Sequence, residues 1–502
     1  KGIKLHEEVL ERGLTENSSY ISSALIAMYM KCGDVGKAQK SFDELSIQDT
    51  VSWNALISGY QQQNYGYEAL CCFDRMRNEG LSPDLVTFTC ILNACGSTRS
   101  IVKGKAFHEE IVMIGGLLQK SVILGNALVD MYAKCCFLAK AREVLYELPI
   151  RDAVSWNAVI VGYVQQGQGE EALKCFEQMR KEGLSGDLVT FLSILKACAS
   201  TRAIKKGMEM HDEIVGSGLL DKNSLLGTAL VDMYAKFGML EKAQEILNEL
   251  PVQDVASLSA IIAEYSQQGQ GPEALNICQR MQTKGMSPDA ITFVCMLKAC
   301  GITEAIEKGM QIHNEIVSRG LLGQNIVLGN ALVDMYAKCG MLAKAQELLD
   351  ELPVRDTVSW NALIAGYAQQ GQGHKALDCF EQMQREGLCP DIVTFVCILK
   401  ASVCTRDLDK GRRIHDEITR KGMMGKNIVL DNALIDMYAK CGMLDNAQKL
   451  LNELPGRDVV SWNSVIAGYA HEGQGHEALK CFGQMRNEGF SPDAITFASM
   501  FK

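Results

Sequence analysis

The chain has 502 residues, of which 47% are hydrophobic and 22% charged, with a formal net charge of −10. This composition supports a large buried core and excludes an intrinsically disordered chain. The charge has the wrong sign for binding phosphates through bulk electrostatics, so any nucleic-acid binding requires locally placed cations. Because no run of 18 apolar residues occurs, we expect no membrane span.

A phrase near residue 51, "VSWNALISGY", returns at intervals of 103, 102, 102 and 102 residues, counted between the anchors Trp53, Trp156, Leu258, Trp360 and Trp462. Each interval contains three similar units, here named P (35 residues), L (36 or 37) and S (31). The boundaries are 19–49 (S), 50–84 (P), 85–121 (L), 122–152 (S), 153–187 (P), 188–223 (L), 224–254 (S), 255–289 (P), 290–325 (L), 326–356 (S), 357–391 (P), 392–427 (L), 428–458 (S) and 459–493 (P). Residues 1–18 and 494–502 are partial L units, so we expect a segment of a longer protein.

Every unit has the pattern of two helices. In the unit 357–391, an i, i+3, i+4, i+7 stripe predicts the first helix: Trp360, Leu363, Ile364 and Tyr367. After the break "QGQG", a second stripe follows: Ala376, Phe380 and Met383. Two such helices cannot bury their apolar faces alone, so neighbouring units must stack. We therefore predict an all-α fold, an α-solenoid superhelix of helix-turn-helix repeats.

The nineteen cysteines are spread along the chain, which indicates a reducing environment rather than a disulfide framework. Cys32, Cys135, Cys339 and Cys441 recur beside a lysine, and Phe237 takes the equivalent place once. An apolar replacement favours packing over chemistry at these positions.

The motif "WNALIAGY" followed by "EAL" overlaps the tetratricopeptide pattern, but alternating units of 35, 36 and 31 residues and the ends "SPD" do not. With "NALVDMYAKCG" and "ELPVRD", the whole chain resembles a pentatricopeptide repeat protein of the plant subclass built from P, L and S motifs. The resemblance implies a single-stranded RNA binder that reads one base per repeat. It also implies the site-recognition part of an RNA-editing or processing factor in a mitochondrion or chloroplast, lacking the C-terminal extension and DYW deaminase modules.

In that family, the fifth and last residues of a repeat select the base. The resemblance assigns these roles here to Ser23 and Asp49, Asn54 and Asp84, Asn126 and Asp152, Asn157 and Asp187, Thr228 and Asp254, Ser259 and Asp289, Asn330 and Asp356, Asn361 and Asp391, Asn432 and Asp458, and Asn463 and Asp493. Asn with Asp resembles a uracil reader, and Ser or Thr with Asp a guanine reader. The L units place Thr89, Leu192, Val294 and Val396 at the fifth position and depart from this code. The implied RNA is GUNUUNGGNUUNUU, 5′ to 3′.

The resemblance implies two further sets of contacts. Apolar residues three before the reader resemble wedges between bases: Tyr20, Val51, Ile123, Val154, Leu225, Ala256, Val327, Val358, Val429 and Val460. Lysines at the end of the first S helix resemble phosphate contacts: Lys31, Lys134, Lys236, Lys338 and Lys440. Small organellar editing-factor proteins are implied partners at the L motifs. We expect a monomer without a cofactor or metal.

Each assignment has a structural alternative. The last Asp can cap the next helix, the Asn can bond a preceding turn, and the lysines can be solvated surface groups. A rival function is a protein-interaction scaffold, which the net charge of −10 favours.

We predict no catalytic residues and no enzyme. Five H-x-E phrases occur at His6, His108, His211, His313 and His415, but the P-C-x-x-C half of a zinc deaminase signature is missing. Packing with a hydrogen bond accounts for these histidines. The chain also contains no Walker loop, HExxH or nucleophile elbow.

Overall fold

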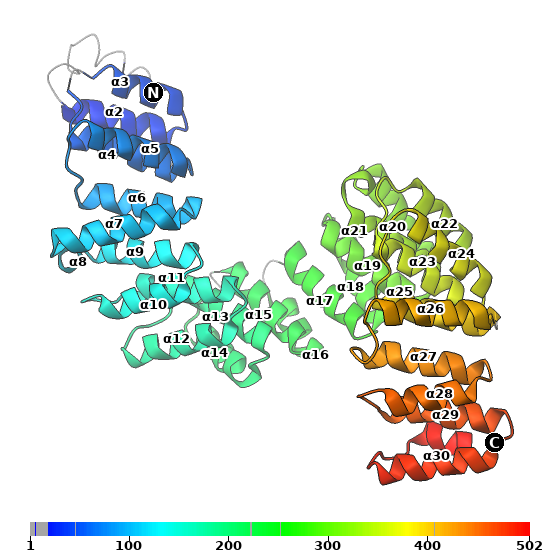
Figure 1. The fold of residues 1–502 in the computed structure, drawn as a ribbon. Coiled ribbons are helices and arrows are strands. Elements are labelled where there is room, and N and C mark those ends of the chain that lie inside the picture. The colour runs from blue at the N-terminus through cyan, green and yellow to red at the C-terminus, as the bar shows by residue number, and fades with distance from the viewer. Residues whose placement is uncertain are drawn as a thin grey trace. The chain divides into compact units, whose positions relative to one another are not determined.

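The computed structural model describes residues 6, 19–45, 47–220, 223–250, 253–405 and 407–501. These residues form helices and turns with no strand (Figure 1). The chain divides into two compact units, residues 1–253 and 254–502. The predicted all-α helical-repeat fold is confirmed.

The first unit consists of helices in pairs. They are α2 (Ser19–Lys31), α3 (Val35–Asp43), α4 (Thr50–Gln62), α5 (Gly66–Asn78), α6 (Leu85–Thr98), α7 (Ile101–Ile114), α8 (Leu117–Lys120), α9 (Val122–Lys134), α10 (Leu138–Glu147), α11 (Ala153–Gln165), α12 (Gly169–Lys181), α13 (Leu188–Thr201), α14 (Ile204–Gly216), α15 (Ser224–Lys236) and α16 (Leu240–Glu249). The four-residue helix α8 is an addition to the expected pairs.

The second unit continues the same order. Its elements are α17 (Val255–Gln267), α18 (Gly271–Thr283), α19 (Ala290–Thr303), α20 (Ile306–Ser318), the short 3-10 helix η1 (Leu322–Gln324), α21 (Ile326–Lys338), α22 (Leu342–Glu351), α23 (Thr357–Gln369), α24 (Gly373–Arg385), α25 (Ile392–Thr405), α26 (Leu408–Arg420), α27 (Ile428–Lys440), α28 (Leu444–Glu453), α29 (Val459–His471), α30 (Gly475–Asn487) and α31 (Ala494–Met500). Like α8, η1 follows the second helix of an L unit, where the longer sequence forms an extra turn.

Local sequence signals set the helix ends. Asp356 caps α23 by accepting from the Ser359 amide, and the Ser359 hydroxyl accepts from the Asp356 amide in return. After α23, Gly371 has a φ of +69°, a left-handed conformation that glycine adopts without a Cβ penalty. The helix therefore ends in "QGQG", and α24 begins at Gly373.

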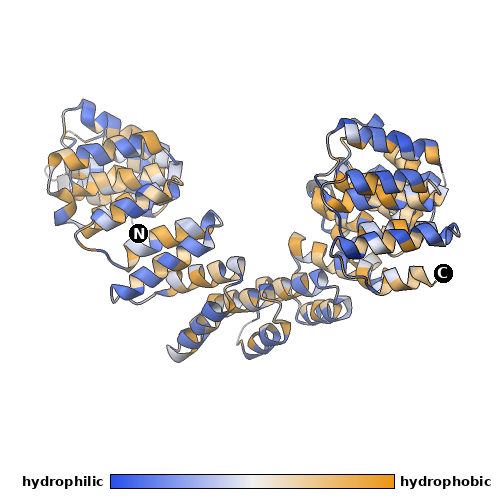
Figure 2. Cartoon of the chain, turned by 60° about the horizontal axis from the view of Figure 1, so that its bottom comes forward, coloured by the Kyte–Doolittle hydropathy of each residue, from blue (hydrophilic) through white to orange (hydrophobic). Residues whose placement is uncertain are grey.

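Within each of the two compact units, a first helix packs against its own second helix and against the first helix of the next repeat, as α9 does with α10 and α11. The apolar stripes meet in these contacts, and the anchors Trp53, Trp156, Leu258, Trp360 and Trp462 are at most 1% exposed. Figure 2 shows the consequence, with hydrophobic and hydrophilic segments alternating along individual helices. One face of each first helix remains outside this core. No described helix is long and apolar enough to cross a membrane.

One buried carboxylate departs from the repeat pattern. Asp431 on α27 is 3% exposed, where the equivalent S-unit residues are Ser22, Gly125, Gly227 and Gly329. Burial raises the pKa of Asp431, although the Gly425 amide donates a hydrogen bond to it. A carboxyl group with a raised pKa in the folded state favours folding at low pH and opposes it once ionised.

We therefore expect Asp431→Asn to stabilise the protein at pH 7, because the amide keeps an acceptor for Gly425 and removes the buried charge. A gain of about 1 kcal/mol raises Tm by roughly 2–4 °C. Thermal unfolding followed by circular dichroism at pH 7 and below pH 4 measures the effect. The difference should vanish at the lower pH, where both states are protonated; a difference independent of pH would contradict the assignment.

Candidate nucleic-acid interface

The exposed faces of successive first helices line a groove in the first unit. Its volume is about 630 Å³, and it runs over α6, α9, α11 and α13. The lining includes the predicted readers Asn126 with Asp152 and Asn157 with Asp187, which come from consecutive S and P units. The predicted wedges Ile123 and Val154 and the lysine Lys134 line the same groove. Residues far apart in sequence thus meet on one surface.

A repeated hydrogen bond joins the fifth and last residues. In seven repeats, Asn Nδ2 donates to the Asp carboxylate over 2.9–3.2 Å: Asn54 to Asp84, Asn126 to Asp152, Asn157 to Asp187, Asn330 to Asp356, Asn361 to Asp391, Asn432 to Asp458 and Asn463 to Asp493. In the pair Asn157–Asp187, the nitrogen lies 2.9 and 3.0 Å from the two oxygens. Two carboxylate oxygens subtend a much smaller angle at nitrogen than the two N–H bonds of an amide. One N–H therefore serves both oxygens, and the second N–H points away from them.

The P units add a second hydrogen bond to the reader. Thr190 Oγ1 donates to Asn157 Oδ1 over 2.6 Å, and Thr87, Thr394 and Thr496 do the same for their Asn partners. In the S units the following helix has Ser at this place, and its hydroxyl turns to the capping Asp instead. Among the described residues, Asn126 Oδ1, Asn330 Oδ1 and Asn432 Oδ1 are buried without a hydrogen-bond partner. The amide orientation is therefore fixed from both sides only in P units.

The readers that are Ser or Thr have different contacts. Ser259 Oγ lies 2.6 Å from Thr292 Oγ1 and 2.6 Å from the Val255 carbonyl oxygen. Asp289 Oδ1 accepts hydrogen bonds from the Thr292 amide and from the Thr292 hydroxyl. Because the reader of this repeat is Ser259, no Asn side-chain amide donates to this carboxylate, and Asp289 Oδ2 keeps its accepting capacity.

The remaining two readers lie on the first helices of S units. Ser23 is buried on α2, and Thr228 is half-buried on α15, where its hydroxyl donates to the Ser224 carbonyl over 3.2 Å.

The capping alternative for the last Asp also holds. Asp49, Asp84, Asp152, Asp187, Asp254, Asp289, Asp356, Asp391, Asp458 and Asp493 each accept from a backbone amide in the first turn of the next helix. Burial raises the pKa of Asp187, but hydrogen bonds from Thr190 and Asn157 outweigh it and hold the pKa below its usual range. The carboxylate is thus ionised at neutral pH, and capping and pairing with Asn occur together.

The predicted wedges are exposed apolar side chains. Tyr20, Val51, Ile123, Val154, Leu225, Val327, Val358, Val429 and Val460 expose more than half of their surface, and Ala256 is also exposed. Sequence reasoning missed that the L units continue this row with Val86, Val189, Ile291, Val393 and Ile495. Val189 lines the groove beside Asp187. The sequence signal that could have identified them is an apolar residue at the second position of every unit, including the L units.

Four of the five predicted phosphate-binding lysines have an acidic partner. Lys134, Lys236, Lys338 and Lys440 form ion pairs over 2.7–2.8 Å with Asp130, Asp232, Asp334 and Asp436, each one helical turn earlier. Lys31 is exposed at the end of α2, and Ala27 stands where the others have Asp. The intrahelical pairs neutralise part of the expected positive charge.

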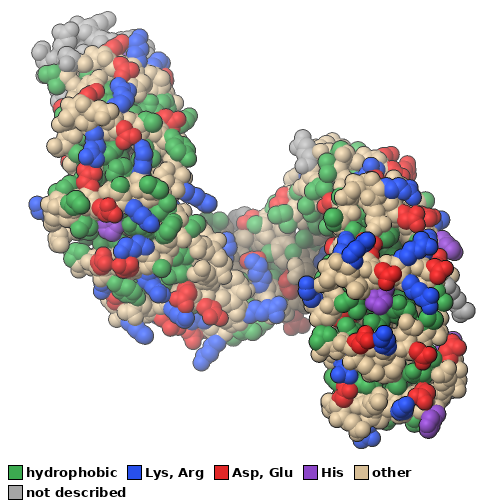
Figure 3. Space-filling model, viewed as in Figure 1, with side chains coloured by type: hydrophobic (Ala, Val, Ile, Leu, Met, Phe, Trp, Pro, Cys, Tyr) green, Lys and Arg blue, Asp and Glu red, His purple; other side chains and the backbone are tan. Residues whose placement is uncertain are grey.

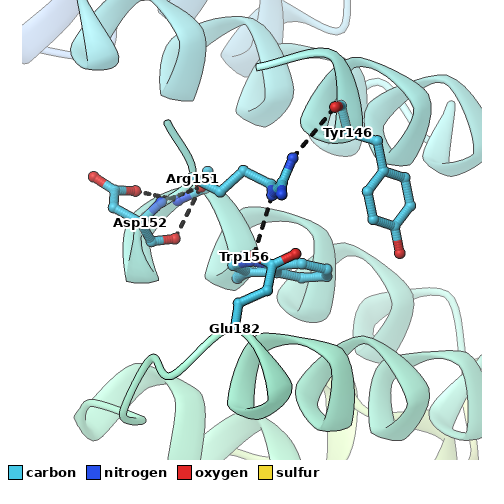
Figure 4. Close-up of polar contacts among 6 residues, drawn as sticks. Tyr146, Arg151, Asp152, Trp156 and Glu182 are labelled. Carbon is cyan, nitrogen blue, oxygen red and sulfur yellow. Dashed lines mark hydrogen bonds and ion pairs between the residues drawn. The ribbon is translucent and has the colours of Figure 1, made fainter. Parts of the chain in front are cut away.

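The change from Trp to Leu258 coincides with a change in the polar residues around the anchor. Trp156 Nε1 donates to Glu182 Oε2 over 3.1 Å, and Arg151 Nε donates to the same oxygen over 3.1 Å (Figure 4). Trp360, Glu386 and Arg355 repeat the arrangement. In the repeat with Leu258, Lys284 replaces this Glu and Gln253 replaces the Arg. The loss of the indole therefore accompanies the loss of both of its polar partners.

The predicted packing role of the H-x-E histidines is confirmed. Nδ1 lies 2.7–2.9 Å from a Tyr hydroxyl in the pairs His6–Tyr29, His108–Tyr132, His211–Tyr234, His313–Tyr336 and His415–Tyr438. Burial lowers the pKa of His108, which keeps the ring neutral at pH 7. Within the described ranges, no three His, Cys, Asp or Glu side chains cluster as metal ligands.

None of the nineteen cysteines, all of which the structure describes, is joined in a disulfide. Burial raises the pKa of Cys95 and of Cys300 to about 12, so these thiols are unreactive at neutral pH.

A testable consequence follows from the Thr190–Asn157 bond. Thr190→Val leaves Asn157 Oδ1 buried without a donor, and we expect a loss of about 1–3 kcal/mol in stability. Thr190→Ser retains a hydroxyl and should lose less. Hydrogen exchange over α11 and α13 provides the measurement; equal protection in all three proteins would show that this hydroxyl does not hold the reader.

Stacked helix pairs that bring a repeated polar pair onto one groove define a helical-repeat protein with an extended binding surface. The family model for the PPR repeat family matches residues 48–97, 151–200, 253–301, 355–403 and 457–502, and that for the PPR repeat matches 228–255, 330–356 and 432–459. A chloroplastic pentatricopeptide repeat-containing protein of Arabidopsis thaliana is 32% identical over 482 residues, covering 96% of this chain and 77% of the relative. The chain belongs to the pentatricopeptide repeat family.

Other relatives are longer. A mitochondrial pentatricopeptide repeat-containing protein of Arabidopsis thaliana is 36% identical over 99% of this chain, which spans 48% of that relative. Among solved structures, the pentatricopeptide repeat protein PPR10 from maize matches 95% of this chain and 80% of its own, with a TM-score of 0.58 and 20% identity. At this identity the match supports the fold.

Proposed function

We propose that this chain binds single-stranded RNA by sequence, one base for each P or S unit, along the groove. The observation that carries the proposal is the Asn–Asp pair repeated in seven repeats, with a second amide N–H directed away from the carboxylate. Structures of PPR10 in complex with an 18-nt psaJ RNA element give the proposal a precedent in the same fold.

The contacts account for a choice between uracil and guanine. In an Asn–Asp pair, one N–H of the Asn side-chain amide donates to the Asp carboxylate, and the remaining N–H donates to a uracil carbonyl. In the Ser259 repeat, Asp289 Oδ2 is available, and it accepts from the Watson–Crick donors of guanine. Exposed apolar residues such as Val154 and Ile123 separate neighbouring bases. The base sequence GUNUUNGGNUUNUU follows from this scheme.

We further propose a role as the site-recognition part of RNA editing or processing in a mitochondrion or chloroplast. The support is that several relatives carry mitochondrial or chloroplastic in their names. Membership of the P, L and S subclass rests on the unit lengths and stays part of the proposal, as do docking of small editing-factor proteins at L motifs and a monomeric state.

A protein-interaction scaffold is the second candidate. Besides the net charge of −10, exposed apolar residues on α7 favour it: Val102, Val112 and Met113. Figure 3 shows acidic and basic side chains interspersed over the visible face. This surface chemistry suits a protein partner as well as a nucleic acid.

Binding of a labelled oligonucleotide separates the two candidates. We expect GUAUUAGGAUUAUU, with A at each N, to bind at least tenfold more tightly than its scrambled version at physiological salt. Fluorescence anisotropy measures both affinities, and the same sequence as DNA is a further control. Equal binding of the two RNAs would contradict base reading; absence of RNA binding would favour the scaffold.

A further inference from the structure

The ninth residue of a first helix lies one turn beyond the reader, and on α6, α9 and α11 this residue (Asn93, Asp130 and Val161) lines the groove. In the first complete L unit, Thr89 and Asn93 occupy the fifth and ninth positions, and both line the groove. In later L units the ninth residues are Lys196 on α13, Lys298 on α19 and Lys400 on α25. These three residues are here called the L lysines.

Ion pairing separates the L lysines from the S lysines at the helix ends. Lys134 is held by Asp130 over 2.7 Å, and its chain lies against α6, since a Cβ added to Gly96 would be 3.2 Å from Lys134 Cδ. Lys338 repeats this arrangement with Asp334 and Gly301. Asp130 and Lys134 both line the groove, so their charges cancel there.

The L lysines have no such partner. All three are exposed, and none forms an ion pair with a carboxylate of the described residues. Asp187 and Asp391, the last-position residues before the helices of Lys196 and Lys400, already accept from Asn, Thr and backbone amides. The fifth residues of the same units, Leu192, Val294 and Val396, cannot hydrogen-bond a base.

We propose that Lys196, Lys298 and Lys400 form the phosphodiester-binding sites of the groove. L units then hold the backbone of single-stranded RNA, while P and S units read its bases. This inference rests on the proposed RNA binding and assigns the phosphate contacts to unpaired cations in place of the paired S lysines. It also explains how a chain with a net charge of −10 binds a polyanion through a few local charges.

Two triple variants with the same change in charge test the proposal. Lys196→Gln/Lys298→Gln/Lys400→Gln removes the L lysines, and Lys134→Gln/Lys236→Gln/Lys338→Gln removes matched S lysines. Affinity is measured against KCl concentration with GUAUUAGGAUUAUU and with its scrambled version. The logarithm of the association constant decreases linearly with the logarithm of the salt concentration, and each lost phosphate contact makes this slope shallower by about 0.7. We therefore expect the slope of the L variant to be shallower than that of the wild type by about 2. The S variant should change the slope by less than half as much.

The outcomes distinguish this proposal from base reading. An unchanged slope in the L variant, or an equal or larger fall in the S variant, overturns the phosphate assignment. If the wild-type protein binds both RNAs equally, base reading is contradicted, and the salt slopes still show whether the L lysines bind phosphates. If it binds neither RNA, both proposals are contradicted. Asp130→Asn/Asp232→Asn/Asp334→Asn, which frees the S lysines, should steepen the slope. Circular dichroism melts verify that each variant is folded.

Discussion

Asn157→Ser is expected to shift base preference from U to G at the fifth nucleotide of the bound RNA, by about tenfold to a hundredfold. The substitution removes the N–H that occupies Asp187, which returns an acceptor to the groove, as at Asp289. Hydrogen bonds to charged groups contribute about 1.5–3 kcal/mol, and 1.4 kcal/mol corresponds to a factor of ten in affinity. Thr190 still offers its hydroxyl to the new side chain, as Thr292 does to Ser259.

Four RNAs that differ only at the fifth nucleotide measure this change by anisotropy. The reciprocal variant, Ser259→Asn, is the matched control, and it should shift the eighth nucleotide from G to U while leaving the fifth unchanged. Uniform weakening across all four bases in either variant would mean that the side chain stabilises the fold without reading a base.

Trp156→Ala has the largest expected effect on stability. Trp156 is fully buried between helices and donates to Glu182, so truncation opens a cavity and leaves a carboxylate that pairs only with Arg151. Loss of a buried Trp costs about 3–5 kcal/mol. Because Leu258 is fully buried at the same place in another repeat, Trp156→Leu should lose less.

Hydrogen exchange over α11 and α12, combined with urea unfolding, measures the loss. The control is Val154→Ala, two residues away on the same helix but 58% exposed, which should change stability by less than about 0.5 kcal/mol. The same control should nevertheless weaken RNA binding through the lost wedge. Comparable destabilisation by both variants would contradict the division between a buried and a groove-facing side of α11.

Periodicity alone predicted the helix pairs, because an apolar stripe of period 3.6 must be buried and the glycine breaks leave few other folds. The residues Asn157 and Asp187 could be singled out from their recurrence. Their hydrogen bond could not, since it joins residues 30 apart and depends on how α11 and α13 pack.

Two features of the groove depended on geometry that the repeat pattern does not carry. The role of Thr190 depends on the rotamer of its hydroxyl, which Ser in the S-to-P junctions does not share. The S lysines were predicted to bind phosphate because they recur at one place in the repeat. An Asp recurs one turn earlier, as Asp130 does before Lys134, and the ion pair between them shows that their charges cancel. The substitution of Leu258 was visible in sequence, but its meaning required the bond between Trp156 and Glu182.

Selection of bound RNA from a random pool tests the central claim most directly. The account predicts enrichment of U at the positions read by Asn–Asp pairs and G at the eighth nucleotide, with no preference at the four L positions. Sequences selected by Ser259→Asn should differ from the wild-type set at that one nucleotide. A pool without enrichment, or the same motif from both proteins, would contradict it.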